Sequence, residues 1–154
     1  FLKPFTKNIL IYEKEFKIKD NNKIYQSSLN KLLKKSDVIS LHIHADKKNI
    51  NFLDSKKLKL LKKNVVIINT SRGEIINETE MTRFLNKNKN AKYYTDVLKN
   101  EIISKNKSNI LRKFKKNSKQ IVITPHIGGM TEDAQQLAYH GVLDDLIKFN
   151  NSKN

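Results

Sequence analysis

The chain has 154 residues, a formal net charge of +16 at pH 7 and 38% hydrophobic residues. This length and apolar content suit one globular domain, and no apolar run approaches the roughly 18 residues that a membrane-spanning helix needs. The absence of cysteine excludes disulfides and thiolate metal sites, and it suits a reducing compartment such as the cytoplasm.

The positive charge comes almost entirely from lysine, because only three of the 31 basic residues are arginine (Arg72, Arg83 and Arg112). Arginine is the preferred side chain for bidentate contacts with phosphates and bases, whereas the lysines are spread over nearly every segment. A basic nucleic-acid binder is therefore the least favoured function, since no patch gathers the charge.

Short apolar runs alternate with helical patterns along the chain, which predicts βαβ units and a parallel sheet. Strands are expected at residues 8–12, 38–43, 65–68, 92–97 and 120–124. The run Val65–Ile68 is too apolar for a half-exposed strand and suits the centre of the sheet. We therefore predict an α/β fold with no internal domain boundary.

Each helix between these strands is expected to begin at a capping residue and to turn one apolar face inward. The caps are Ser28, Asp54, Asn77 and Thr131, and Asn77 with Glu80 has the spacing of a capping box. The inward faces are Leu29, Leu32 and Leu33; Leu58, Leu60 and Leu61; Met81, Phe84 and Leu85; and Leu137, Ala138, Val142, Leu146 and Ile147. A further helix is expected at 107–116, and the polar tail 150–154 is expected to fray.

Three chemically active side chains, Arg72, Glu101 and His126, each follow one of the predicted strands. The carboxyl ends of parallel strands meet at one edge of a sheet, where such sheets bind ligands, so we expect these side chains to share a site. They offer a fixed cation for a carboxylate, a proton donor near neutral pH and a carboxylate that holds this donor. The pattern predicts chemistry on a small anionic carbonyl compound.

Two other kinds of site are disfavoured. His42 and His44 are two residues apart and share a strand face, but only Asp46 could join them, which leaves too few ligands for a metal ion. Ser71 lacks a paired base, so we do not expect a serine nucleophile.

The three motifs Ile68–Gly73, Asp96–Glu101 and Thr124–Gly129 stand in the order found in a known family. The chain resembles the D-isomer-specific 2-hydroxyacid dehydrogenases, in the C-terminal part of their NAD-binding domain. The resemblance implies a Rossmann-like, doubly wound parallel sheet. It also implies an oxidoreductase that reversibly reduces a 2-oxoacid to a D-2-hydroxyacid with NAD.

The resemblance assigns the reaction to three catalytic residues. Arg72 binds the substrate carboxylate, His126 gives or takes the hydroxyl proton, and Glu101 hydrogen-bonds the imidazole and favours its charged form. The implied cofactor-binding residues are Glu13, Ile43, Thr70, Asp96, Gly128 and Gly129. Among them, Asp96 accepts a hydrogen bond from the nicotinamide carboxamide, and Glu13 accepts from the adenosine ribose, where its charge disfavours NADP.

The same resemblance implies that residues 1–154 form a partial NAD-binding domain. The glycine-rich turn that precedes Glu13 in the family, and the first strand before it, are expected to lie outside the chain. In the family's strand order 3-2-1-4-5-6 this strand is central. The substrate domain is also expected outside the chain, so residues 1–154 alone should not turn over substrate. A homodimer is the implied assembly.

An alternative of another class is a regulatory or interaction protein that keeps this fold as an NAD-sensing scaffold. Retention of Arg72, Glu101 and His126 together favours the enzyme, because a scaffold has no chemical need for them.

Overall fold

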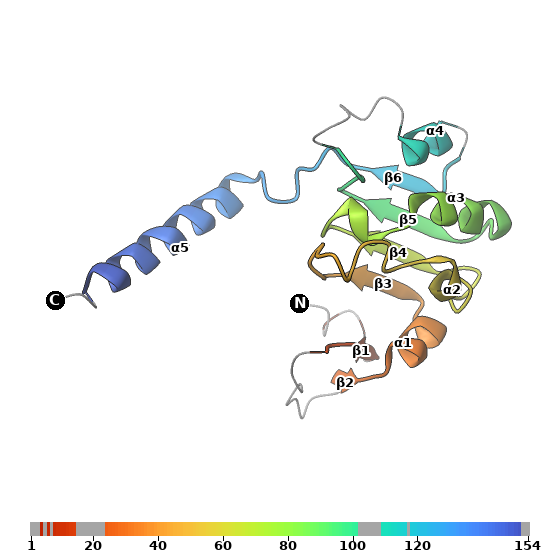
Figure 1. Cartoon of the computed structure of the whole chain (residues 1–154), viewed down its shortest axis with the longest axis horizontal. Helices are drawn as coiled ribbons and strands as arrows, with labels where there is room; N and C mark the ends of the chain where they lie inside the picture. Colours follow the sequence, from red (N-terminus) through yellow and green to blue (C-terminus); the bar gives the residue numbers. More distant parts are fainter. Residues whose placement is uncertain are drawn as a thin grey trace. The chain divides into compact units, whose positions relative to one another are not determined.

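The computed structural model describes residues 4, 6, 8–14, 24–101, 109–116 and 118–151. The strands are β1 (Ile9–Ile11), β2 (Ile24–Gln26), β3 (Val38–Leu41), β4 (Val66–Asn69), β5 (Lys92–Thr95) and β6 (Ile121–Ile123). The helices are α1 (Leu29–Lys35), α2 (Ser55–Leu58), the 3-10 turn η1 (Gly73–Ile75), α3 (Glu78–Lys87), α4 (Ile110–Lys115) and α5 (Glu132–Asn151) (Figure 1). From β2 onward strands alternate with helices, as predicted.

The described strands form two parallel sheets, one of β1 and β2 and one in the order β3-β4-β5-β6 (Figure 1). The predicted α/β class is confirmed, and β4 lies inside the larger sheet, as its apolar sequence indicated. The separation falls between β1 and β3, the two strands between which the expected central strand belongs. Strand β2 was not predicted from the sequence.

The core of the larger sheet forms where the predicted helix faces meet the strands. Leu33, Leu58, Met81, Leu85 and Leu111 from the helices are buried against strand residues that include Ile39, Ile67, Tyr93 and Ile121. The predicted caps Ser28 and Asp54 are confirmed, because their side-chain oxygens accept from the N–H groups of Lys31 and Lys57.

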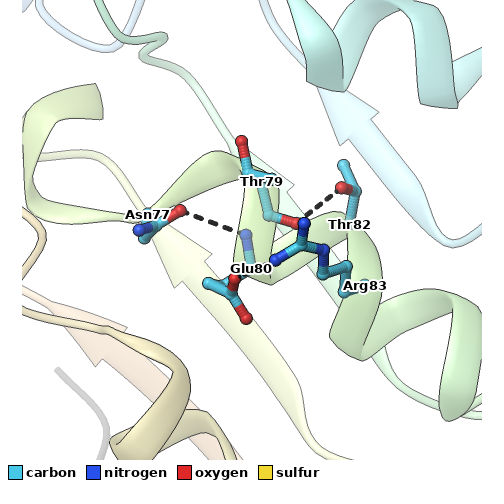
Figure 2. Close-up of polar contacts among 5 residues, drawn as sticks. All are labelled: Asn77, Thr79, Glu80, Thr82 and Arg83. Atoms are coloured by element: carbon cyan, nitrogen blue, oxygen red, sulfur yellow. Dashed lines mark hydrogen bonds and ion pairs between the residues drawn. The ribbon is translucent and has the colours of Figure 1, made fainter.

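The first turn of α3 corrects one prediction (Figure 2). Asn77 Oδ1 accepts from the Glu80 N–H at 3.1 Å, which is one half of a capping box. The Glu80 carboxylate pairs with Arg83 instead, and the Asn77 N–H donates to the Leu53 carbonyl at 3.4 Å. The reciprocal bond is replaced because an arginine one turn along offers the carboxylate a charged partner.

The chain divides into two units, Phe1–Ile123 and Thr124–Asn154, where the sequence predicted no boundary. In the second unit Thr131 caps α5 as predicted, its hydroxyl accepting from the Ala134 N–H at 3.2 Å. None of the described α5 residues is buried within this unit, so the predicted inward face has no partner there; Leu137 is 78% exposed and Leu146 57%. The polar tail is helical through Asn151, and residues 152–154 lie outside the described part, as do 107 and 108 of the helix predicted at 107–116. In the described chain no helix combines the length and hydropathy needed to cross a bilayer.

Candidate active site

The loops after β3, β4 and β5 emerge from one edge of the larger sheet. The strands are in register there, with Leu41 opposite Asn69 and Asn69 opposite Thr95. Ile43 therefore follows β3, Thr70 and Arg72 follow β4, and Asp96 and Glu101 follow β5 at the same edge. The parallel topology thus gathers the candidate residues of these three loops as predicted.

Asn69 holds the turn that carries Arg72. Its buried Nδ2 donates to the Arg72 carbonyl at 2.9 Å and to the Tyr93 hydroxyl at 3.4 Å, and its Oδ1 accepts from the Ser71 N–H at 3.1 Å. The Arg72 side chain is exposed and donates through Nη1 to the Ser71 carbonyl at 2.7 Å. The Arg72 guanidinium therefore faces solvent, while hydrogen bonds of the buried Asn69 side chain fix the backbone that carries it. Asn69 was not predicted, although a polar residue ending an apolar strand is a signal for such a role.

The same turn is tied to both neighbouring strands. Ser71 Oγ donates to the Leu41 carbonyl at 2.5 Å, and Thr95 Oγ1 donates to the Asn69 carbonyl at 3.2 Å. Burial raises the pKa of Tyr93 to about 12, and its neutral hydroxyl accepts from Asn69 Nδ2. The Ser71 hydroxyl thus has a structural role, because it binds the backbone of β3.

The loop after β5 carries Asp96 and Glu101 in different surroundings. Asp96 is 8% exposed, and its N–H donates to the Asn69 carbonyl at 3.1 Å. Glu101 is half-buried, and its Oε2 accepts from the Leu98 N–H at 3.0 Å. The loop backbone therefore orients the Glu101 carboxylate directly.

The Arg72 turn and the Glu101 loop meet at Gly73. A Cβ built on Gly73 would lie 2.1 Å from the Leu98 carbonyl carbon and 2.1 Å from the Lys99 nitrogen. No real side chain fits at that distance, so this position requires glycine for a close backbone approach. The contact fixes the two loops against each other.

The residues expected at the adenosine end and at the nicotinamide end of NAD lie in separate loops. Glu13 follows β1; its Oε1 accepts from the Lys14 N–H at 2.6 Å, and the Lys14 ammonium lies 5.8 Å from the centroid of the Phe52 ring. Ile43 is partly buried and packs against the core, and His42 Nε2 lies 2.8 Å from Ser40 Oγ. Within the described ranges no three His, Cys, Asp or Glu side chains gather as metal ligands would.

His126, Gly128 and Gly129 belong to the second unit, in the turn before α5. His126 is exposed and has φ +58°, a left-handed conformation in which histidine is enriched. A Cβ on Gly129 would meet no atom within 4 Å, so space alone does not require glycine there. Because the two units are described separately, the meeting of His126 with Arg72 and Glu101 stays a prediction.

A parallel sheet with polar loops at its carboxyl edge is typical of nucleotide-binding α/β domains. Residues 1–128 match the family described as D-isomer specific 2-hydroxyacid dehydrogenase, NAD binding domain. The chain belongs to this family, which confirms the resemblance and the predicted cofactor class, NAD.

Several known proteins are similar to the chain over most of its length. Glyoxylate reductase of Thermococcus litoralis is 34% identical over 118 residues, which are 77% of this chain and 34% of the relative. D-3-phosphoglycerate dehydrogenase of Haemophilus influenzae is 29% identical over 147 residues, 94% of this chain and 35% of the relative. The structure of D-lactate dehydrogenase from Aquifex aeolicus, complexed with NAD and lactic acid, has a TM-score of 0.78 and 25% identity, covering 94% of this chain and 46% of that one. The chain thus spans about a third of the length of these curated relatives.

Proposed function

We propose that the chain is part of an NAD-dependent D-2-hydroxyacid dehydrogenase, which interconverts a small 2-oxoacid and the D-2-hydroxyacid by hydride transfer. The observation that carries the proposal is the backbone contact at Gly73, which fixes the Arg72 turn against the loop that ends in Glu101. Family membership and the NAD and lactic acid bound to the Aquifex aeolicus relative support the reaction class.

The residues at the sheet edge suit an NAD molecule. The Asp96 carboxylate is a strong acceptor for the cofactor's carboxamide, and the exposed Thr70 with the apolar Ile43 would line the same edge. Gly128 and Gly129 leave backbone open to close approach, and Glu13 would accept from the adenosine ribose hydroxyls. When bound, NAD supplies the group that takes up or gives the hydride.

The substrate would be held and protonated by the remaining residues. The Arg72 guanidinium pairs with the carboxylate of the 2-oxoacid through two parallel hydrogen bonds and draws electron density from the neighbouring ketone. His126 gives a proton to the ketone oxygen during reduction and takes it back during oxidation. Glu101 accepts from the imidazole, which orients the ring and stabilises its cationic form.

The proposal is tested by His126→Gln in the full-length product of the gene that encodes this chain. We expect kcat for NADH-dependent reduction of glyoxylate to fall by about 10² to 10⁴, the usual contribution of a general acid, while the Kd for NADH changes less than about twofold. The matched control is His140→Gln on the exposed face of α5, which should keep the parent rate. Normal turnover by the His126 variant would contradict the assignment.

We further propose that residues 1–154 are a partial NAD-binding domain, whose glycine-rich turn and substrate domain are encoded outside them. Sequencing of the DNA upstream of Phe1 tests this: an open frame for a strand, G-x-G-x-x-G and a helix supports it, and a stop codon or unrelated sequence contradicts it. The proposed homodimer rests on the family resemblance, and the proposed cytoplasmic location on the absence of cysteine. Sedimentation equilibrium tests the dimer.

A further inference from the structure

Glu78 is a buried carboxylate that the sequence gives no reason to single out. It opens α3, is only 8% exposed, and uses both of its oxygens. Oε1 accepts from the Lys99 N–H at 2.9 Å, and Oε2 accepts from Asn109 Nδ2 at 2.8 Å. Asn109 is in turn the N-cap of α4. One carboxylate therefore joins the loop after β5 to the start of the helix that follows it.

Two further contacts hold the same loop from the same segment of chain. Glu74 Oε1 accepts from the Asn100 N–H at 3.1 Å, and Gly73 packs on the Leu98–Lys99 peptide at a distance that excludes a side chain. Asn100 has φ +55°, a left-handed conformation that asparagine tolerates and that needs support from its surroundings. Residues 73, 74 and 78 thus fix two successive peptide groups of the loop, Leu98–Lys99 and Lys99–Asn100.

These contacts end at Glu101. The Leu98 N–H, directly before the Lys99 N–H that Glu78 holds, donates to Glu101 Oε2 at 3.0 Å. The segment that makes these contacts, residues 73–78, begins directly after Arg72. Displacement of the turn from Leu98 to Asn100 would therefore move the Glu101 carboxylate relative to Arg72.

We propose that Glu78 is a positioning residue of the dehydrogenase: it fixes the Leu98–Asn100 turn and so sets where Glu101 stands relative to Arg72. This inference rests on the proposed function, since the role of Glu101 does. A carboxylate is the side chain that the geometry needs, because both of its neighbours are donors. Glutamine has the same shape but turns an NH₂ group toward one of the two donors, which leaves that donor unsatisfied.

The test compares Glu78→Gln with Glu80→Gln in the full-length gene product. Glu80 lies in the same first turn of α3 and pairs with the exposed Arg83, so its replacement removes one charge from that turn and leaves the loop contacts intact (Figure 2). Hydrogen–deuterium exchange of a peptide covering residues 96–101 should be about tenfold faster in Glu78→Gln and unchanged in Glu80→Gln.

Kinetics separate positioning from a general structural role. We expect Glu78→Gln to lower kcat for glyoxylate reduction by about tenfold with KM for NADH within about twofold, and to alter the pH profile of kcat in the same direction as Glu101→Gln. Faster exchange with an unchanged kcat and pH profile would overturn the inference, and so would exchange equal to that of Glu80→Gln.

A second variant keeps the test decisive if Glu78→Gln does not fold. Glu74→Ala removes the exposed acceptor that binds the Asn100 N–H of the same loop, so it should fold, speed exchange of the 96–101 peptide and lower kcat by a smaller factor. Parent-like exchange in this variant would contradict the proposal that these contacts fix the Leu98–Asn100 turn. If the parent enzyme reduced no 2-oxoacid, the proposed function would be refuted. The exchange data alone would then show whether Glu78 fixes the Leu98–Asn100 turn.

Discussion

The inner strands β4 and β5 and the helix α5 place apolar sequence in opposite surroundings. Ile67 and Tyr93 are 0% exposed, whereas Leu137 and Leu146 on α5 are 78% and 57% exposed. The continuous apolar run of β4 and the helically spaced apolar residues of α5 each predicted the element that forms. The apolar pattern thus specifies the element, while burial depends on whether a complementary surface is packed against it.

The largest test of this contrast is a pair of truncations to alanine. Ile67→Ala should lower the free energy of unfolding by about 2 to 5 kcal/mol, because it leaves a cavity inside the larger sheet. Leu146→Ala on α5 should change it by less than about 0.5 kcal/mol, as exposed substitutions usually do. Urea unfolding of both variants measures the difference. A cost for Leu146→Ala close to that of Ile67→Ala would show that α5 is packed against a surface in solution.

The two regions should also respond oppositely to alanine in place of glycine. Gly73→Ala puts a Cβ onto the Leu98–Lys99 peptide and should cost about 1 to 3 kcal/mol or more, since backbone has to move. Gly141 lies within α5 with open space at its Cβ position, so Gly141→Ala should stabilise the helix by up to about 1 kcal/mol.

Thermal unfolding followed by far-UV circular dichroism measures both glycine variants. Parent-like stability of Gly73→Ala would contradict the close backbone contact that joins the Arg72 and Glu101 loops.

Local sequence rules predicted most of the fold. The caps at Ser28, Asp54 and Asn77 form because a side-chain oxygen and an N–H three residues later need only local geometry. The larger sheet follows from apolar runs that alternate with helices. The exposed face of α5 could not be predicted, since a helical period carries no information on what covers it.

The candidate site likewise contains residues that the sequence predicted and residues that it did not. Arg72, Asp96 and Glu101 could be located because they follow strands and belong to ordered motifs. Glu78 was missed because its role depends on Lys99, 21 positions away. Asn69 was missed although its bonds to Ser71 and Arg72 are local, because its position at the strand end was not used as a signal. A glutamate in the first turn of a helix is common for electrostatic reasons alone, so its burial has no signature in sequence.

The smallest predicted effect concerns the pH dependence of Glu78. Burial raises the pKa of its carboxyl above the ordinary 4.5, against the lowering effect of the bonds from Lys99 and Asn109. A raised pKa in the folded state means that the folded chain binds this proton more tightly than the unfolded chain. The stabilisation is therefore full below about pH 4.5 and is lost as the pH rises through the folded-state pKa.

Glu78→Gln removes this titration, so the advantage of the parent over the variant in free energy of unfolding should shrink as the pH rises from about 4 to about 8. Urea unfolding of the two proteins across this range measures the change. An advantage that grows with pH would mean that the two donated hydrogen bonds outweigh burial in solution. The direction of this change with pH bears on how Glu78 holds the Leu98–Asn100 turn. Its two hydrogen-bond donors favour the ionised carboxylate, whereas burial disfavours it. A shrinking advantage would therefore show that the loop is held at some expense of stability, as expected where position serves the reaction more than the fold.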